Sequence, residues 1–472
     1  MRKETHVSAS ASAVAATLPI AAQPTDPTPG AVVIFTVGTQ GDARPCIGLG
    51  QSLKRAGYPV RIVTSENFAP LVREAGLEFA AISADFSDLL TNNPETVDKA
   101  LNPWYLVQHT RAKFAQWAAT WAQEARPACK GAALLVGTGI VTQLAKAIGE
   151  ADGIPFIQAH LQPFTPSRKL SPLSFWSERE FPGAVNMALF SVMKLLAWYT
   201  LKPAVNGAIR PQLKLPLFPW YGPFFDKNPE RMRVLYGYSR HILPPPDDWP
   251  AEVKVTGSWF LDQADVWQPP QALADFLAEG DKPVYFGFGS MLANNAEALT
   301  QVVLDAVRLS GRRAVLATGW GGLRCDPGRL NDQVYVIEAA PHDWLFPRMA
   351  ATVQHGGAGT TVAAARAGVP SVFVPFFGDQ PFWARRMHAL GATPPALDRR
   401  TVTAEQMAQA VAQALQPERC ARGRTGREDP RRKRRRLRGP RAHRMGPVAA
   451  AAAGARYGRA GAGARGLSSL SG

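Results

Sequence analysis

Residues 355–361 read HGGAGTT: one histidine, three glycines, an alanine and two threonines between two apolar runs. The run before them, ATVQHG (351–356), predicts a buried strand, and TTVAAARAG (360–368) predicts a helix. The first N–H groups of a helix have no partner and its dipole favours anions, so a glycine-rich entry lets a phosphate approach the backbone closely. A tight strand-to-helix turn without a ligand would also explain the glycines.

The stretch is neither a GK[ST] phosphate loop nor a GxGxxG fingerprint. A second glycine loop, GFGSM (287–291), follows another predicted strand of the same half of the chain. Because the carboxyl ends of parallel strands meet at one edge of a sheet, we expect the two loops to converge there.

Outward from this loop, apolar strand patterns alternate with helical ones, which is typical of βαβ units in a parallel sheet. The pattern restarts once, after LDQADVWQPPQ (261–271), which has the composition of a linker. We therefore predict an α/β protein with two Rossmann-like doubly wound domains facing a cleft. The strands are expected at 31–38, 59–65, 77–83, 132–137, 154–160, 283–289, 312–319, 333–340, 351–356 and 369–376. The helices are expected at 43–57, 67–76, about 95–125, 140–153, 184–205, 360–368, 381–391 and 403–415.

The expected domain plan has five parts. Residues 1–29 are a disordered leader, because their apolar stretch is too interrupted by Ser, Thr and Pro for an export signal. Residues 30–260 form an acceptor-binding domain, 261–272 a linker, 273–417 a donor-binding domain and 418–472 a disordered Arg/Gly/Ala-rich tail.

Composition limits the classes of protein. We find no apolar run of 18 or more residues, and therefore expect no membrane span. The four cysteines lie far apart without a CxxC pair, which argues against disulfides or a zinc site and favours the cytoplasm. The segment 161–250 breaks the strand–helix rhythm and is rich in Pro, Trp and Phe. We expect part of it to form the wall of a site for an apolar ligand, and part to be irregular packing.

The positive charge is concentrated at the end of the chain. Of 53 basic and 37 acidic residues, 16 and 3 lie in 418–472, so a nucleic-acid-binding role would rest on the tail alone, and we expect no nucleic-acid partner. One codon choice for GREDPRRKRRRL, read one base later, gives GEKIRAESGVA, an amphipathic helix. We hypothesise that the chain is frameshifted after about residue 420. The alternative is a genuine basic arm, and the nucleotide sequence decides between the two.

Three polar side chains stand beside the predicted loops. His355 is placed to donate to a phosphate oxygen, although a lone histidine is more often structural. In PFFGDQPFW (375–383), Asp379 and Gln380 lie between a strand end and a helix start. A carboxylate beside an amide suits vicinal hydroxyls, whereas a helix cap by Asp379 is the plainer interpretation.

The stretch APHDWLFPRMAATVQHGGAGTTVAAARAGVPSVFVPFFGDQPFWARR (340–386) is similar to the donor-binding region of nucleotide-sugar-dependent glycosyltransferases. The nearest groups are sterol 3-beta-glucosyltransferases and bacterial glycosyltransferases of antibiotic aglycones. VGTQGDARPCIGLGQSLKRAG (37–57) resembles their opening strand and loop, and LQPFTPSR (161–168) their acceptor-side loop. The resemblance covers roughly 31–416 and implies the two-domain GT-B fold, inversion at the sugar and no metal or other cofactor.

The resemblance also implies roles for individual residues. The diphosphate would lie on the glycine loop with help from Ser290, and the sugar hydroxyls would be held by Asp379 and Gln380. The complete set of donor-site residues implied in this way is Gly289, Ser290, His342, His355, Gly356, Gly357, Gly359, Thr360, Asp379 and Gln380.

The reaction needs a base for the acceptor hydroxyl. Many plant relatives place a histidine after the first strand, where this chain reads GTQGD and offers Asp42. The sterol and antibiotic groups read RGD at this point, so Gln40 replaces their arginine. His160, at the end of a predicted strand, is the reserve base. Asp42 would alternatively be the N-cap of a helix beginning near Pro45.

The predicted function is transfer of a hexose, glucose in the first instance, from a UDP-sugar to a hydroxyl of a sterol-like, polyketide or hydroxy-lipid acceptor. Peripheral contact with a membrane would suit such an acceptor. Plant relatives stack a tryptophan on uracil where this chain has Ala339. A dTDP-sugar (rhamnose-type) transferase is therefore the alternative within the class, and a nucleotide-sugar epimerase on the same fold the alternative outside it.

Overall fold

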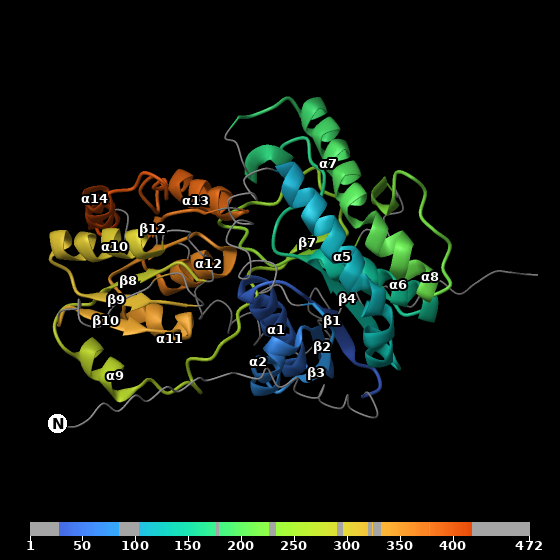
Figure 1. Cartoon of the computed structure of the whole chain (residues 1–472), viewed down its shortest axis with the longest axis horizontal. Helices are drawn as coiled ribbons and strands as arrows, with labels where there is room; N and C mark the ends of the chain where they lie inside the picture. The colour runs from blue at the N-terminus through green and yellow to red at the C-terminus, as the bar shows by residue number, and fades with distance from the viewer. Residues whose placement is uncertain are drawn as a thin grey trace, which may run out of the picture.

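The computed structural model describes residues 28–84, 103–175, 179–225, 233–289, 296–319, 323, 332–376 and 378–417. Nearly all of the expected leader, the whole tail from 418 onward and Ser290 lie outside these residues. Two parallel α/β units lie side by side, the N-terminal domain around strands β1–β7 and the C-terminal domain around β8–β12 (Figure 1). The prediction of two doubly wound domains is confirmed.

The N-terminal sheet has the strand order β3-β2-β1-β4-β5-β6-β7 with every pairing parallel. Its strands are β1 (Val32–Phe35), β2 (Val60–Thr64), β3 (Glu78–Ala81), β4 (Leu134–Thr138), β5 (Phe156–His160), β6 (Val234–Tyr236) and β7 (Val253–Val255). The α-helices of this domain among the described residues are α1 (Gln40–Arg55), α2 (Ala69–Glu74), α5 (Pro103–Ala125), α6 (Thr142–Asp152), α7 (Gly183–Ala204) and α8 (Arg210–Gln212).

The C-terminal sheet has the order β10-β9-β8-β11-β12, again with parallel pairings. Its strands are β8 (Val284–Gly287), β9 (Ala314–Ala317), β10 (Val334–Ile337), β11 (Ala351–Gln354) and β12 (Ser371–Phe373). The helices are α9 (Gln271–Ala278), α10 (Ala296–Ser310), α11 (His342–Leu345), α12 (Ala358–Ala367), α13 (Gln380–Ala389) and α14 (Ala404–Ala414).

Strand order places a topological switch in each sheet. The chain leaves β1 toward β2 on one side and returns as β4 on the other, and β8 stands in the same relation to β9 and β11. Ligands of doubly wound folds bind outside the carboxyl ends of strands at such a switch. GTQGD follows β1, and HGGAGTT follows β11, so both stretches singled out from the sequence lie at switch points.

Apolar side chains cover both faces of each sheet, as parallel sheets require. In β1, Val33 and Phe35 pack toward α5 and α6, while Val32 and Ile34 pack toward α1 and α2. A further cluster joins the domains, with Tyr238 of the N-terminal domain packed against Trp383 of α13 at 6.0 Å between ring centroids. The domains therefore share a buried apolar contact beside the cleft.

The ten strands expected from the sequence are present. β6 and β7 were missed because each is only three residues long, and they lie within and just after the aromatic segment. The first helix starts at Gln40, three residues before the predicted start, because Thr39 and Asp42 form a capping box at its N-terminus.

One premise of the expectation of no membrane span, that the chain holds no apolar segment of sufficient length, is not met. Among the described residues one helix, Gly183–Gln212, is long and apolar enough to cross a membrane by length and composition alone, with a mean hydropathy of 1.4 in its best window. It is longer than the apolar run visible in the sequence because α7 continues through a π-helical turn (Val205–Ile209) into α8. It stays apolar because Lys194 and Lys202 are its only charged residues before Arg210.

Candidate active site

A cavity of about 790 Å³ lies between the two domains. Its wall is built from loops at the carboxyl ends of strands in both sheets and from the first turns of α1, α12 and α13. Nine residues proposed from the sequence line it: Asp42, Gly289, His342, His355, Gly357, Gly359, Thr360, Asp379 and Gln380. His160 and Gly356 do not line it, and Ser290 lies outside the described residues.

Asp42 projects from the first turn of α1. Its Oδ2 accepts hydrogen bonds from Thr39 N (2.8 Å) and Thr39 Oγ1 (3.1 Å). Gly38 has φ +138°, and a Cβ there would lie 2.3 Å from the same oxygen, so only glycine fits. Thr39 is the N-cap and Asp42 the third residue of the helix, which differs from the alternative in which Asp42 caps. Asp42 thus helps to cap α1 while facing the cavity.

The environment of Asp42 suits a base. Burial raises its pKa to about 6, and the negative charge of Asp379 adds to the rise, against the hydrogen bonds from Thr39. A general base works best with a pKa near the working pH. Above pH 6 the carboxylate is mostly ionised and more basic than an ordinary aspartate.

The glycine loop folds as the pattern predicts. Gly356 has φ +90°, and Gly357, with φ −58°, is the N-cap of α12. A Cβ on Gly359 would have nothing within 4 Å, so the backbone is open toward the cavity at this point. The first-turn N–H groups of α12 have no partner within the helix. This is the backbone arrangement of an anion site.

His355 lies directly beneath that turn. A Cβ on Gly357 would be 2.5 Å from its Nε2, and one on Gly289 would be 3.2 Å from its Cε1. The two glycines therefore make room for the imidazole from both loops. Burial lowers the pKa of His355 to about 4, and its buried Nδ1 has no hydrogen-bond partner among the described residues. The ring is therefore neutral at pH 7, and its Nδ1 is available for a hydrogen bond to a bound ligand.

Asp379 and Gln380 stand at the start of α13. Asp379 occupies the N-cap position, but its side chain makes no cap hydrogen bond. Its Oδ2 instead accepts from Trp383 Nε1 (2.8 Å) and from Gln162 Nε2 (2.9 Å) of the N-terminal domain. Gln380 Oε1 accepts from Phe376 N (2.7 Å), which fixes the loop before the helix. Asp379 is therefore the N-cap residue of α13, but it does not cap the helix with its side chain.

The two other histidines proposed from the sequence, His160 and His342, are neutral at pH 7. Burial lowers the pKa of His160 to about 4; its Nε2 lies 3.4 Å from Gln158 Oε1, and its ring meets Phe164 edge to face. Burial, with the charges of Arg44 and His355, lowers the pKa of His342 to about 3. His342 stacks on Phe346 at 4.3 Å. His160 packs against protein side chains and does not line the cavity, so it is poorly placed to act as the reserve base.

Several cavity residues escaped the sequence reasoning. Arg44, one turn after Gln40, brings a guanidinium into the cavity and binds Gln263. Arg366 of α12 pairs with Asp262 of the linker. Gln162 lay inside LQPFTPSR, a stretch already noted, but nothing in one sequence indicates that it reaches Asp379. Such pairs separated by more than 100 residues appear only after folding.

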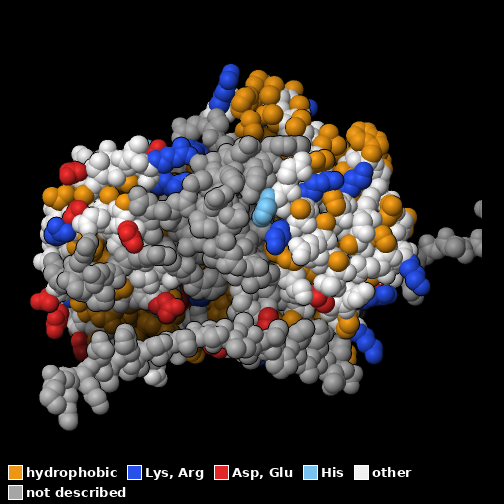
Figure 2. Space-filling view, in the orientation of Figure 1, with side chains coloured by type: hydrophobic (Ala, Val, Ile, Leu, Met, Phe, Trp, Pro, Cys, Tyr) orange, Lys and Arg blue, Asp and Glu red, His pale blue; other side chains and the backbone are white. Residues whose placement is uncertain are grey.

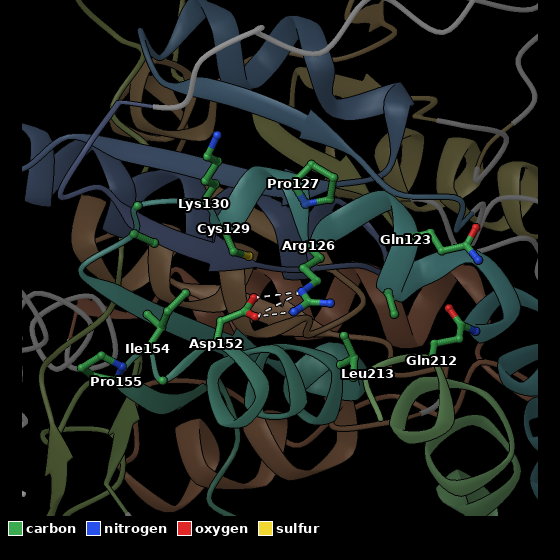
Figure 3. A pocket seen from close by; sticks show the side chains of 14 residues that line it. Gln123, Arg126, Pro127, Cys129, Lys130, Asp152, Ile154, Pro155, Gln212 and Leu213 are labelled. Carbon is green, nitrogen blue, oxygen red and sulfur yellow. Dashed lines mark hydrogen bonds and ion pairs between the residues drawn. The ribbon is translucent and has the colours of Figure 1, made fainter. Parts of the chain in front are cut away.

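A second cavity of about 770 Å³ lies at the amino ends of strands β4 and β5, the opposite end of these strands from the first cavity (Figure 3). It is formed by residues before β4 and β5, and the Arg126–Asp152 ion pair crosses it at 2.6 Å. Because the two cavities have nearly equal volumes, volume does not indicate which of them is the active site. This one lies at the amino ends of the strands and holds none of the proposed residues, whereas ligands favour the carboxyl ends.

Comparison with known proteins shows what the two domains are similar to. Residues 32–171 match the glycosyltransferase family 28 N-terminal domain, and 313–426 match the erythromycin biosynthesis protein CIII-like C-terminal domain. The chain is 34% identical over 380 residues to a sterol 3-beta-glucosyltransferase of Leptosphaeria maculans, and 33% identical over 371 residues to one of Aspergillus fumigatus. These alignments cover 77% and 76% of the chain but 25% and 26% of the relatives. The chain spans about a quarter of the length of these relatives.

Solved structures share the fold. The kitacinnamycin glycosyltransferase superposes with a TM-score of 0.60 at 20% identity, covering 86% of this chain and 96% of its own. The calicheamicin glycosyltransferase gives 0.57 at 20%, covering 87% and 97%. The resemblance to sterol and antibiotic glycosyltransferases, and the GT-B fold that it implied, are confirmed.

Proposed function

On the premise that the chain is homologous to glycosyltransferases in both of its domains, we propose that it is an inverting hexosyltransferase. It moves glucose from UDP-glucose to the hydroxyl of a lipophilic acceptor, for which a sterol is the first candidate. The sterol 3-beta-glucosyltransferases to which it is similar support the choice of sugar and acceptor.

The observation that carries the proposal is the meeting of two sites in one cavity. Asp42, a carboxylate with a raised pKa, comes from one domain, and the open N-terminus of α12 comes from the other. One suits a base and the other suits a diphosphate. Such an arrangement serves a displacement in which a nucleophile loses a proton as an anion departs.

In the proposed reaction the acceptor hydroxyl gives its proton to Asp42, and its oxygen attacks the anomeric carbon. The bond to the diphosphate breaks on the opposite side, so the configuration inverts. The leaving UDP is stabilised by the first-turn N–H groups of α12, and His355 supplies a further polar contact. Asp379 and Gln380 hold the sugar hydroxyls, with Asp379 fixed in place by Gln162 and Trp383.

We further propose that no metal ion takes part, because the helix N-terminus supplies the charge compensation that a cation would otherwise give. Turnover should then be the same with EDTA as without it. A loss of turnover with EDTA that Mg²⁺ or Mn²⁺ restores would contradict this part of the proposal.

A panel of nucleotide sugars tests the choice of donor. UDP-glucose and UDP should raise the melting temperature of the protein more than dTDP-rhamnose or dTDP does. Ala339 lines the cavity where plant relatives stack a tryptophan on the base, and this observation favours keeping the dTDP-sugar alternative. If dTDP compounds raise the melting temperature more, the donor nucleotide is dTDP instead of UDP, and the proposal that the protein is a transferase still stands.

A further inference from the structure

Helix α7 is apolar on two sides but packs on only one. Its inner side buries Phe190 and Trp198 against α5 and neighbouring segments, while its outer side exposes aliphatic residues. Val192 is 61% exposed and Leu196 is 43% exposed. A helix that is apolar all round normally lies inside a core or a bilayer. Here part of that surface lies against solvent.

Of the six large apolar residues that α7 exposes, all but Met187 form a stripe. Val185, Val192 and Tyr199 repeat at intervals of seven, and Leu195 and Leu196 lie between the last two, so all share one flank of the helix. The chain after α8 extends the patch with Leu217 (60% exposed) and Trp220 (75% exposed). We call these seven residues the α7 face: Val185, Val192, Leu195, Leu196, Tyr199, Leu217 and Trp220. In Figure 2 apolar side chains crowd the end of the N-terminal domain where α7 lies, with basic side chains beside them.

The acceptor site does not account for this surface. From the aromatic segment the cavity is lined by 161–162 and 237–238, with 258–262 after it, and by no residue of α7 or of 213–225. Of the aromatic segment, only a few residues near its two ends line the cavity, and the expectation that it forms the wall of a ligand site stays a prediction. Contiguous exposed apolar patches of this kind mark interaction sites.

Charge indicates the partner. The 45 residues from 181 to 225 contain no Asp or Glu, but include Lys194, Lys202 and Lys214. Arg111 of α5 lies over the ring of Tyr199 at 4.3 Å, and Lys194 lies over Phe225 at 5.3 Å. Apolar side chains ringed by cations and free of acids complement an anionic lipid surface. Exposed Trp and Tyr are also the residues that favour the boundary between lipid and water.

The C-terminal end of the long helix rules out insertion across a bilayer. Arg210 is buried in the domain, where it pairs with Glu150 at 2.9 Å and lies 3.9 Å over Phe218. Asn206 bonds the backbone of Phe218 through both side-chain atoms. Pulling this turn into lipid would break those contacts. The helix is held along the protein surface and presents its flank.

We propose that the α7 face docks on an anionic membrane, with α7 lying in the plane of the lipid–water interface. This goes beyond the proposed function, because it concerns a surface separate from the cavity and holds whatever the acceptor is. Where the acceptor is itself a membrane lipid, the docked enzyme would meet it without its leaving the bilayer for water.

Vesicle flotation of the full chain tests the proposal. The protein should float with vesicles of phosphatidylcholine containing about a quarter phosphatidylserine, and less with phosphatidylcholine alone. The double variant Val192→Glu/Leu196→Glu should lower partitioning at least about tenfold, because two charges would enter the apolar layer. The matched control Val266→Glu/Leu309→Glu places two charges on exposed apolar positions of other surfaces and should float like the wild type.

A second pair of variants tests the electrostatic part. Lys202→Glu should reduce flotation with the anionic vesicles more than with the neutral ones, whereas Lys254→Glu, an exposed lysine on β7, should have little effect. Melting temperature and UDP affinity, measured on each variant, should match the wild type, since the face is remote from the cavity. These readouts separate failure of docking from failure of the proposed function.

Two results would overturn the proposal. One is the absence of flotation with either vesicle, or flotation that the Val192→Glu/Leu196→Glu change leaves intact. The other is a lipid-free dimer, seen by analytical ultracentrifugation and abolished by that same change, which would assign the face to a second copy of the chain.

Discussion

Asp379 of the C-terminal domain accepts a hydrogen bond from Gln162 of the N-terminal domain, with Nε2 and Oδ2 2.9 Å apart. The residue proposed to hold the donor sugar is thus positioned partly by the loop that resembles the acceptor-side loop. Under the proposed function, placement of the donor sugar depends on this contact between the two domains.

Gln162→Leu should therefore raise the KM for UDP-glucose several-fold while leaving the affinity for UDP alone nearly unchanged, because UDP lacks the sugar that Asp379 contacts. Steady-state kinetics and calorimetric titration with UDP measure the two quantities. Gln212→Leu removes a comparable side-chain bond, to Ala119 O at 2.9 Å, away from the cleft and serves as the control. Equal losses of UDP and UDP-glucose affinity would mean that Gln162 supports the fold of the site as a whole.

Asp42→Asn should lower turnover about a hundredfold or more, with UDP affinity preserved, because the amide keeps the shape of the carboxylate but takes up no proton. Its oxygen can still accept from Thr39, so the start of α1 should remain intact. Turnover near that of the wild type would shift the proton to solvent or to another group.

The pH dependence follows from the same residue. Since burial raises the pKa of Asp42 to about 6, the reactive carboxylate is lost as the pH falls through 6. The kcat/KM of the wild type should fall about tenfold for each pH unit below that point. The residual activity of Asp42→Asn should lack this step. A wild-type profile that stays flat from pH 7 to 5 would contradict the assignment.

Gly359→Val tests the phosphate loop more cleanly than a change at Gly357, where a new Cβ would strike His355. At Gly359 the added side chain meets open space, so it should block the diphosphate and leave the melting temperature unchanged or slightly higher. Gly207→Val, also into open space but far from the cavity, should bind UDP normally. UDP binding retained in Gly359→Val would place the diphosphate elsewhere.

The buried histidines predict a loss of stability in mild acid. The pKa values of His160, His342 and His355 fall from 6.5 to between about 3 and 4 on folding, so the unfolded chain takes up protons that the folded chain refuses. Their contribution to stability is present above pH 6.5 and is lost as the pH falls from 6.5 toward 4. Asp42, whose pKa is raised, acts in the opposite direction over pH 6 to 4.

Denaturant unfolding at pH 7 and pH 4.5 should show this loss, and His342→Gln should make the difference between the two pH values smaller. An unchanged difference in the variant would indicate that His342 is protonated in the folded protein as well.

The sequence predicted the two sheets well, because buried parallel strands such as VVIF and ATVQ are continuous apolar runs closed by glycines. The sequence also indicated Asp42 and the α12 loop, because the end of a strand and the start of a helix are determined by residues close together in the chain. It did not predict the contacts of Asp379 with Gln162 or of Arg366 with Asp262, which depend on how the domains meet. It also did not show which part of the aromatic segment is buried and which is exposed, because one sequence does not tell an inward-facing tryptophan such as Trp198 from an outward-facing one such as Trp220.

We propose that one cavity joins a base from the first domain to a nucleotide-sugar site from the second. Incubating the full chain with UDP-α-glucose and a sterol in anionic vesicles, then analysing the product by mass spectrometry and proton NMR, tests this arrangement. We expect a sterol glucoside with the large anomeric coupling of a β-linkage, formed by the wild type and nearly absent with Asp42→Asn. An α-linked product, or equal product from wild type and Asp42→Asn, would contradict it.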